Sequence, residues 1–83
     1  PLIVAAKYGH LHFIKILIEK DVSLDRRDQE GMTALHHAIE KRFEDVAIYL
    51  IQAGASLTTT DGKGRNAYTL ALEVKNTPVI DYL

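Results

Sequence analysis

The sequence predicts an all-α protein, a solenoid of stacked helix–turn–helix units that β-turn or hairpin loops connect. Small, large and turn residues recur with a period of 33 along the 83 residues. Each complete period holds two short stretches in which apolar residues recur at three- or four-residue spacing, as on one face of a helix. Helices this short are marginal alone, so neighbouring units must bury one another's apolar faces. We expect a single repeat domain over residues 1–83.

Residues 28–60 form the complete unit. It opens with a turn at Asp28–Gly31, whose glycine can adopt the positive φ that a tight turn needs. Thr33 follows as the N-cap of the first helix, because its oxygen can accept from the exposed amides of the next turn. A break at Arg42 separates this helix from the second, and Gly54 ends the second helix.

The two flanking units are incomplete copies. The first, residues 1–27, lacks a leading turn, and the third, residues 61–83, is truncated in its second helix. We therefore expect an excerpt of a longer array. Asp21 and Arg42 stand at helix ends where a left-handed backbone is expected, and Phe43 is expected to pack onto the corner beside Arg42.

The motif Asp28-x-x-Gly31-x-Thr33-Ala34-Leu35-His36-x-Ala38 resembles the signature of the ankyrin-repeat family, with Ala34 where proline is usual. Gly9-His10 and Gly54-Ala55 match later marks of that family, so the resemblance covers all 83 residues. It implies an ankyrin-repeat solenoid and a non-catalytic protein–protein interaction module. It also implies that His10 and His36 bond backbone groups at turns.

The composition and net charge of the chain argue against some classes of binding partner. A net charge of −1 and a pI near 6.5 argue against nucleic acid or an anionic membrane as the main partner. The chain has no cysteine, which excludes disulfides and is compatible with a reducing compartment. No apolar run reaches 18 residues, and the start of the chain lacks the basic region of a signal peptide. We expect an intracellular location, cytoplasmic or nuclear.

Catalytic and metal sites are not expected. His36 and His37 are adjacent on a helix and point about 100° apart, so they cannot face one ion. His12 and His37 are expected at the surface or facing a partner. Gly62-Lys63-Gly64 lacks the spacing of a phosphate-binding loop, and no serine pairs with a base. We expect no enzyme activity, no cofactor and no metal.

Ankyrin-like arrays line a groove with their turn tips and the exposed side of each first helix. We call the corresponding residues here the candidate groove, and expect it to bind another protein or a peptide of mixed or modest charge. Tyr8, Met32 and Arg65 are of the types that dominate binding energies. The turn residues are Arg27, Gln29, Glu30, Met32, Thr60, Gly62, Lys63 and Arg65, and the helix residues are Lys7, Tyr8, Glu40, Lys41, Glu73 and Val74.

Two alternatives stay open. The segment can instead be a structural spacer or a docking segment within a larger multidomain protein, whether enzyme, channel or scaffold. Both ends of the stack also expose apolar stacking faces, through which self-association is possible.

Overall fold

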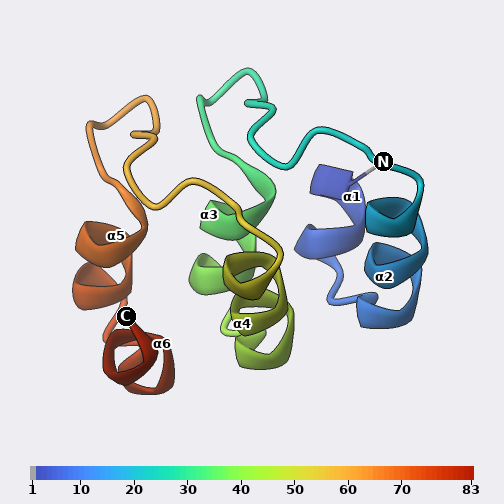
Figure 1. Cartoon of the computed structure of the whole chain (residues 1–83). Coiled ribbons are helices and arrows are strands. Elements are labelled where there is room, and N and C mark those ends of the chain that lie inside the picture. Colours follow the sequence, from blue (N-terminus) through green and yellow to red (C-terminus); the bar gives the residue numbers. More distant parts are fainter. Residues whose placement is uncertain (1) are drawn as a thin grey trace.

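The computed structural model describes residues 2–83, and none of these residues forms a β-strand. The predicted all-α fold is confirmed. Three helix pairs follow one another along the chain and stack in the same order in space, with the turn-bearing loops projecting to one side (Figure 1). The helices are α1 (Leu2–Lys7), α2 (Leu11–Glu19), α3 (Ala34–Glu40), α4 (Glu44–Gln52), α5 (Ala67–Glu73) and α6 (Thr77–Tyr82).

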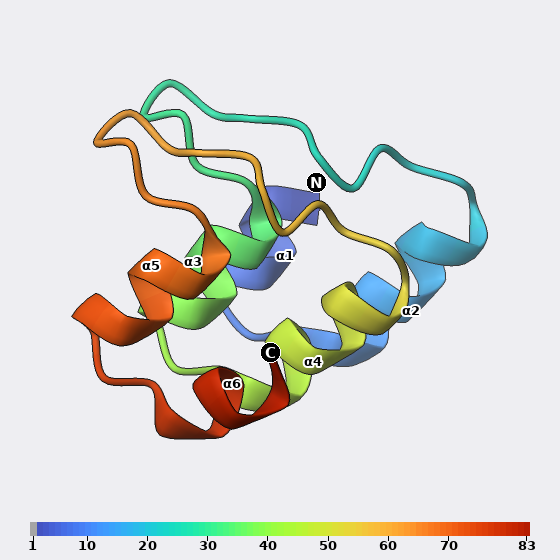
Figure 2. The ribbon, with the colours of Figure 1, turned by 60° about the vertical axis from the view of Figure 1, so that its left-hand side comes forward.

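The pairs form two rows. The first helices α1, α3 and α5 pack side by side, and the second helices α2, α4 and α6 form the other row (Figure 2). An alanine at the same repeat position in each first helix, Ala5, Ala38 and Ala71, is buried. Such a small side chain permits close approach of neighbouring helices. The three first helices therefore pack closely against one another.

The middle pair carries the best-covered core. Leu35 and Ile39 of α3 and Val46 and Leu50 of α4 are fully buried, since this pair has a neighbour on both sides. Thr33 caps α3 as predicted: its hydroxyl accepts from the His36 N–H at 3.3 Å, and its own N–H donates to His36 Nδ1 at 3.1 Å. This cap thus fixes the residue at which α3 begins.

Some helix ends use a left-handed backbone without glycine. Asp21, which follows α2, and Arg42, which lies between α3 and α4, have φ of 60° and 65°, as predicted. The guanidinium of Arg42 donates to the carbonyls of Val74 and Lys75, just past the C-terminal end of α5. A cation is favourable there because the last carbonyls of a helix carry a partial negative charge. Arg42 therefore links the second repeat to the third.

Phe43 packs onto the corner of the preceding repeat, at Gly9. A Cβ atom on Gly9 would lie 3.0 Å from the Phe43 ring, so the missing side chain of Gly9 leaves room for that ring. The aromatic side chain is partly buried against the core.

Leu50→Ala is expected to lower the free energy of unfolding by about 2–5 kcal/mol, because it leaves a cavity where no solvent reaches. Urea titration followed by circular dichroism measures the change. Leu57→Ala, at an exposed loop position, is the matched control and should change stability by less than about 0.5 kcal/mol. Equal unfolding midpoints for the two variants would contradict this core assignment.

Arg42→Ala and Arg42→Gly separate the backbone conformation from the side-chain bonds. Both variants lose the bonds to Val74 and Lys75, but only glycine relieves the left-handed backbone. The glycine variant should exceed the alanine variant by about 1 kcal/mol, and should differ little from the parent. Thermal melts of the three proteins give the comparison. An alanine variant at least as stable as the glycine variant is the opposing result.

Candidate functional site

Hydrogen bonds within and between the loops hold the two turn tips of the candidate groove. Within each turn, the N–H of the glycine donates to the aspartate carbonyl, Gly31 to Asp28 at 2.9 Å and Gly64 to Asp61 at 3.0 Å. The neighbouring tips are joined by the Gly62 N–H, which donates to the Glu30 carbonyl at 2.9 Å. A Cβ on Gly62 would lie 2.8 Å from that oxygen, so this contact requires glycine.

Asp28 organises the first turn with both carboxylate oxygens. Oδ1 accepts from the Glu30 and Met32 amides at 2.9 and 3.0 Å, and Oδ2 lies 2.7 Å from Nε2 of His37. Desolvation raises the pKa of Asp28, but the hydrogen bonds from His37 and the two amides outweigh it and lower the pKa overall. The expectation of a surface position for His37 is therefore wrong. Its ring is buried and holds the turn.

Asp61 organises the second turn through a different partner. Oδ1 accepts from the Lys63 and Arg65 amides, both at 2.9 Å, and Oδ2 receives Nε and Nη2 of Arg65, both at 2.8 Å. The remaining Nη1 of Arg65 lies 3.1 Å from the Glu73 carboxylate. Desolvation raises the pKa of Asp61, but the bonds from Arg65 and Lys63 lower it to about 2 overall. The Arg65 side chain is only 13% exposed, and its guanidinium bonds Asp61 of the turn and Glu73.

His36 joins the two repeats. Its Nδ1 accepts from the Thr33 N–H, so the hydrogen is on Nε2, which donates to the Arg65 carbonyl at 2.9 Å. The structural role that the family resemblance implies is thus confirmed for His36. His10 differs: its side chain is exposed and makes no helix-capping bond.

Met32 is the one candidate-groove residue that is buried, with 4% of its surface exposed. It lies between the first turn and α3, and its side chain belongs to the hydrophobic core, so its expected availability to a partner is wrong. Arg65 and Val74 are half-buried. The others are exposed: Lys7, Tyr8, Arg27, Gln29, Glu30, Glu40, Lys41, Thr60, Gly62, Lys63 and Glu73.

The residues at the ends of the first helices repeat in position but only partly in chemistry. Lys7, Glu40 and Glu73 occupy the same place in α1, α3 and α5, so one lysine is followed by two glutamates. Tyr8 and Lys41 occupy the next place, just past the end of each helix. Tyr8 is 65% exposed and is the aromatic side chain of the candidate groove.

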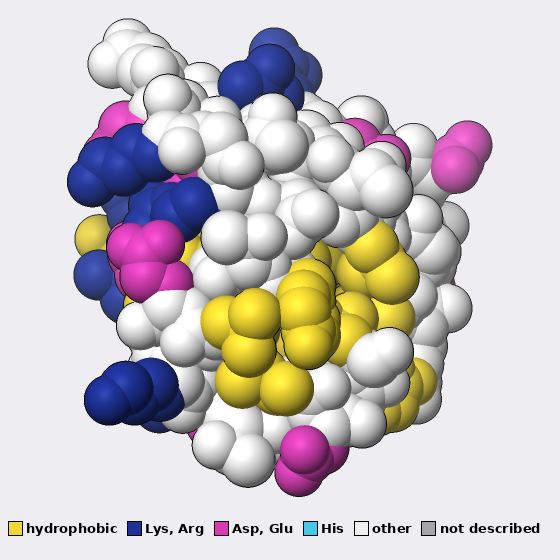
Figure 3. All heavy atoms as spheres, turned by 90° about the vertical axis from the view of Figure 1, so that its left-hand side faces the viewer, with side chains coloured by type: hydrophobic (Ala, Val, Ile, Leu, Met, Phe, Trp, Pro, Cys, Tyr) yellow, Lys and Arg dark blue, Asp and Glu magenta, His cyan; other side chains and the backbone are white. Residues whose placement is uncertain are grey.

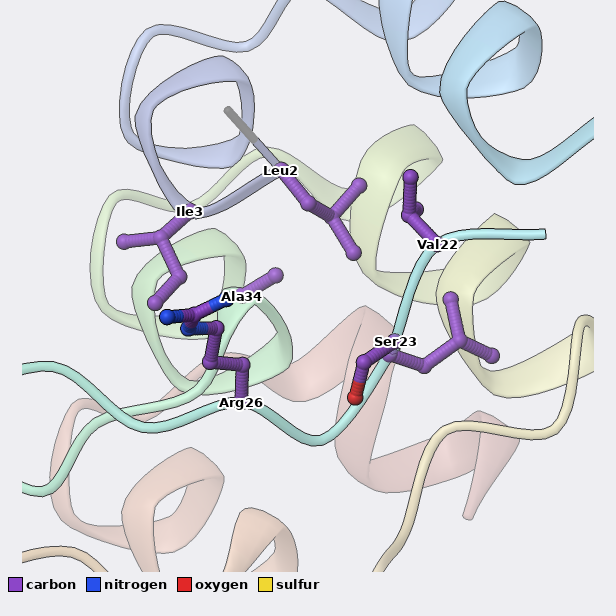
Figure 4. Close-up of a pocket in the computed structure, with 7 residues that line it drawn as sticks. Leu2, Ile3, Val22, Ser23, Arg26 and Ala34 are labelled. Atoms are coloured by element: carbon purple, nitrogen blue, oxygen red, sulfur yellow. The ribbon is translucent and has the colours of Figure 1, made fainter. Parts of the chain in front are cut away.

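A hollow of about 510 Å³ lies between the start of α1 and the loop that follows α2 (Figure 4). Leu2, Ile3 and Val22 give it an apolar wall, and Arg26 reaches toward Ile3 and the start of α3. Ser23 also lines it.

Over the described part of the chain, no group of three or more His, Asp or Glu side chains is placed to hold a metal ion. Within that same part, none of the helices has the length and apolar character to cross a membrane.

Comparison with known proteins gives a family and several relatives. A family model described as ankyrin repeats, in three copies, matches residues 1–61. The mouse ankyrin repeat and SAM domain-containing protein 6 is 33% identical over 73 residues, which is 87% of this chain and 8% of that protein. Human diacylglycerol kinase iota is 38% identical over 82 residues, or 95% of this chain and 8% of the kinase.

A third relative is alpha-latroinsectotoxin-Lt1a of Latrodectus tredecimguttatus, 40% identical over 58 residues, covering 69% of this chain and 4% of the toxin. The chain thus spans less than a tenth of the length of these three relatives. A protein named for its SAM domain, a kinase and a toxin share the matched segment. The likeness therefore concerns the repeats and carries no kinase or toxin activity.

Asp61→Asn should destabilise the protein near neutral pH and make little difference in strong acid. Although desolvation raises the pKa of Asp61, the interactions with Arg65 and Lys63 lower it overall from its usual 3.8 to about 2. Its stabilising effect is therefore fully present above about pH 4 and is lost as the pH falls through 2. Urea titrations of both proteins between pH 6 and about 2 measure the difference in unfolding free energy. A difference that is constant with pH would contradict the Asp61–Arg65 interaction.

Proposed function

The chain belongs to the ankyrin-repeat family, and we propose that its candidate groove binds another protein or a peptide. Repeats of this family are in general non-catalytic protein-interaction modules. The observation that supports the proposal is a difference between two kinds of position. Core positions such as that of Ala38 keep one residue type in every repeat, whereas the position just past each first helix changes from Tyr8 to Lys41 to Val74.

The mechanism is preorganisation. The turn tips are joined by the Gly62–Glu30 hydrogen bond, and the loop before α5 is held by His36. A partner that contacts this surface orders little that was loose, so less of the contact energy is lost to entropy.

The partner is expected to be of mixed charge. Glu30 and Glu40 are exposed carboxylates, and Lys41 and Lys63 are exposed ammonium groups, one beside α3 and one in the second turn. Tyr8 supplies an accessible aromatic ring, a side chain that is frequent among binding hot spots. Met32 and Arg65 are left out as direct contacts, because the first is buried and the second is bound to Asp61.

A docking or spacer role within a larger protein is the second candidate. It is supported by the small share, 8%, that the chain covers of the kinase and of the SAM domain-containing protein. In that case the stack sets the distance between flanking elements or docks against them. We also propose a cytoplasmic or nuclear location, which fluorescence microscopy of the tagged full-length protein would test.

The binding proposal predicts that a triple variant, Tyr8→Ala with Glu40→Ala and Lys41→Ala, loses a partner that the parent captures. The matched control is His12→Ala with Glu19→Ala and Lys20→Ala, which removes a ring, an acid and a base from exposed positions of α2 and its end. Quantitative mass spectrometry of pull-downs compares the three proteins after circular dichroism has shown equal folding. At least a tenfold loss from the first variant alone is expected.

Equal capture by both variants would contradict the candidate groove. Loss from both would show that the contact is not confined to the first helices. A parent that captures nothing above background favours the docking or spacer role.

A further inference from the structure

The carboxylate of Glu73, at the C-terminal end of α5, binds a guanidinium from its own repeat. Arg65 reaches it from the turn: Nη1 lies 3.1 Å from the Glu73 carboxylate, while Nε and Nη2 bond Asp61. A glutamate at this position therefore faces the side of the stack on which the turns project. It accepts an arginine at the surface, since the side chain of Glu73 stays 57% exposed.

The second repeat has the same carboxylate without the arginine. Glu40 occupies the position of Glu73, at the end of α3, and the residue at the position of Arg65 is the buried Met32. None of the ion pairs among residues 2–83 includes Glu40, and its side chain is exposed. Because the second repeat has a neighbour on both sides, this exposure is a property of the stack itself rather than of one of its ends.

An exchange of residue types between two positions explains why the second repeat lacks the arginine. In the third repeat Arg65 bonds the aspartate of the turn, and Leu70 is buried in the core. In the second repeat His37 takes the place of Leu70 and bonds Asp28 at 2.7 Å. Met32 takes the place of Arg65 and enters the core. Each repeat thus has one basic residue for its aspartate, but only the arginine also bonds the glutamate at the end of the helix.

The first repeat places a base at the corresponding position. Lys7 ends α1 as Glu40 ends α3, these two helices pack side by side, and Lys7 too is exposed and in no ion pair of residues 2–83. Basic and acidic side chains lie together along the left edge of the molecule in Figure 3, the side of the first helices. Packed helices lie about 8–10 Å apart, which about three residues of an extended chain span. An extended partner that crosses the two helix ends therefore meets an ammonium group and then a carboxylate.

We propose that the candidate groove binds an extended peptide segment whose arginine pairs with Glu40 and whose acidic residue, about three positions away, pairs with Lys7. This inference rests on the proposed function and names the chemistry of the partner. The guanidinium takes at Glu40 the place that Nη1 of Arg65 has at Glu73. Arginine is preferred over lysine, because its planar group can bind a carboxylate through two N–H donors and is more weakly hydrated. Exposed ion pairs add little affinity, so these pairs select the sequence that binds.

Selection of a phage-displayed library of random dodecapeptides on the 83-residue chain tests the proposal. The peptides that the parent enriches should carry arginine at one position and aspartate or glutamate about three positions away. On Glu40→Gln the arginine preference should disappear, while the acidic preference stays. On Lys7→Glu the acidic preference should change to lysine or arginine, while the arginine opposite Glu40 stays.

An arginine supplied by the chain itself gives a second test. Met32→Arg with His37→Leu copies into the second repeat the two residue types of the third, so the new arginine can bond Glu40 from within. Peptides selected by the parent should bind this double variant about two- to fivefold more weakly in fluorescence polarisation, the range for one exposed ion pair. The matched control is Gln52→Arg, which adds the same charge at an exposed position of α4 and should bind like the parent.

Enriched peptides that lack arginine, or that bind Glu40→Gln as well as the parent, would overturn this inference and leave the binding proposal standing. A parent that enriches no peptide would overturn both. Circular dichroism first establishes that each variant is folded. Because Glu40 and Lys7 are exposed, their two substitutions decide the question even where the double variant does not fold.

Discussion

The structure depends on burial between neighbouring helix pairs, because no pair can bury its own apolar residues. The six helices have only six to nine residues each, too few to be stable in isolation. Leu35, Ile39 and Leu50 are fully buried only because the third repeat covers the second. Stability is therefore a property of adjacent repeats rather than of any one of them.

Hydrogen bonds between repeats fix how the neighbouring helix pairs are aligned in this apolar contact. His36 reaches the Arg65 carbonyl, and Asn76 reaches the Ile39 carbonyl one helix pair back. Both are buried side chains that add a second hydrogen bond to a backbone carbonyl of a neighbouring repeat. The His36 bond, together with the bond from the Gly62 N–H to the Glu30 carbonyl, holds the second turn against the second repeat.

The fold was predictable from the period of 33 residues and the caps, since each local signal agrees with the stack. The burial and the bonding partners of single side chains could not be predicted in this way. Met32 and Arg65 hold the same repeat position, yet one is buried and the other bonds an aspartate. The sequence did not reveal that His37 is buried, because its partner Asp28 is nine residues away. The two side chains meet only when the turn folds back over α3.

Native-state hydrogen exchange, residue by residue, is the measurement that most directly tests whether burial between repeats supplies the stability. Amides of α3 and α4, which have a neighbour on both sides, are predicted to exchange slowest, with the same free energy as global unfolding. Amides of α6, covered on one side, should exchange faster. Equal protection of all six helices, or greatest protection in α6, would contradict this account.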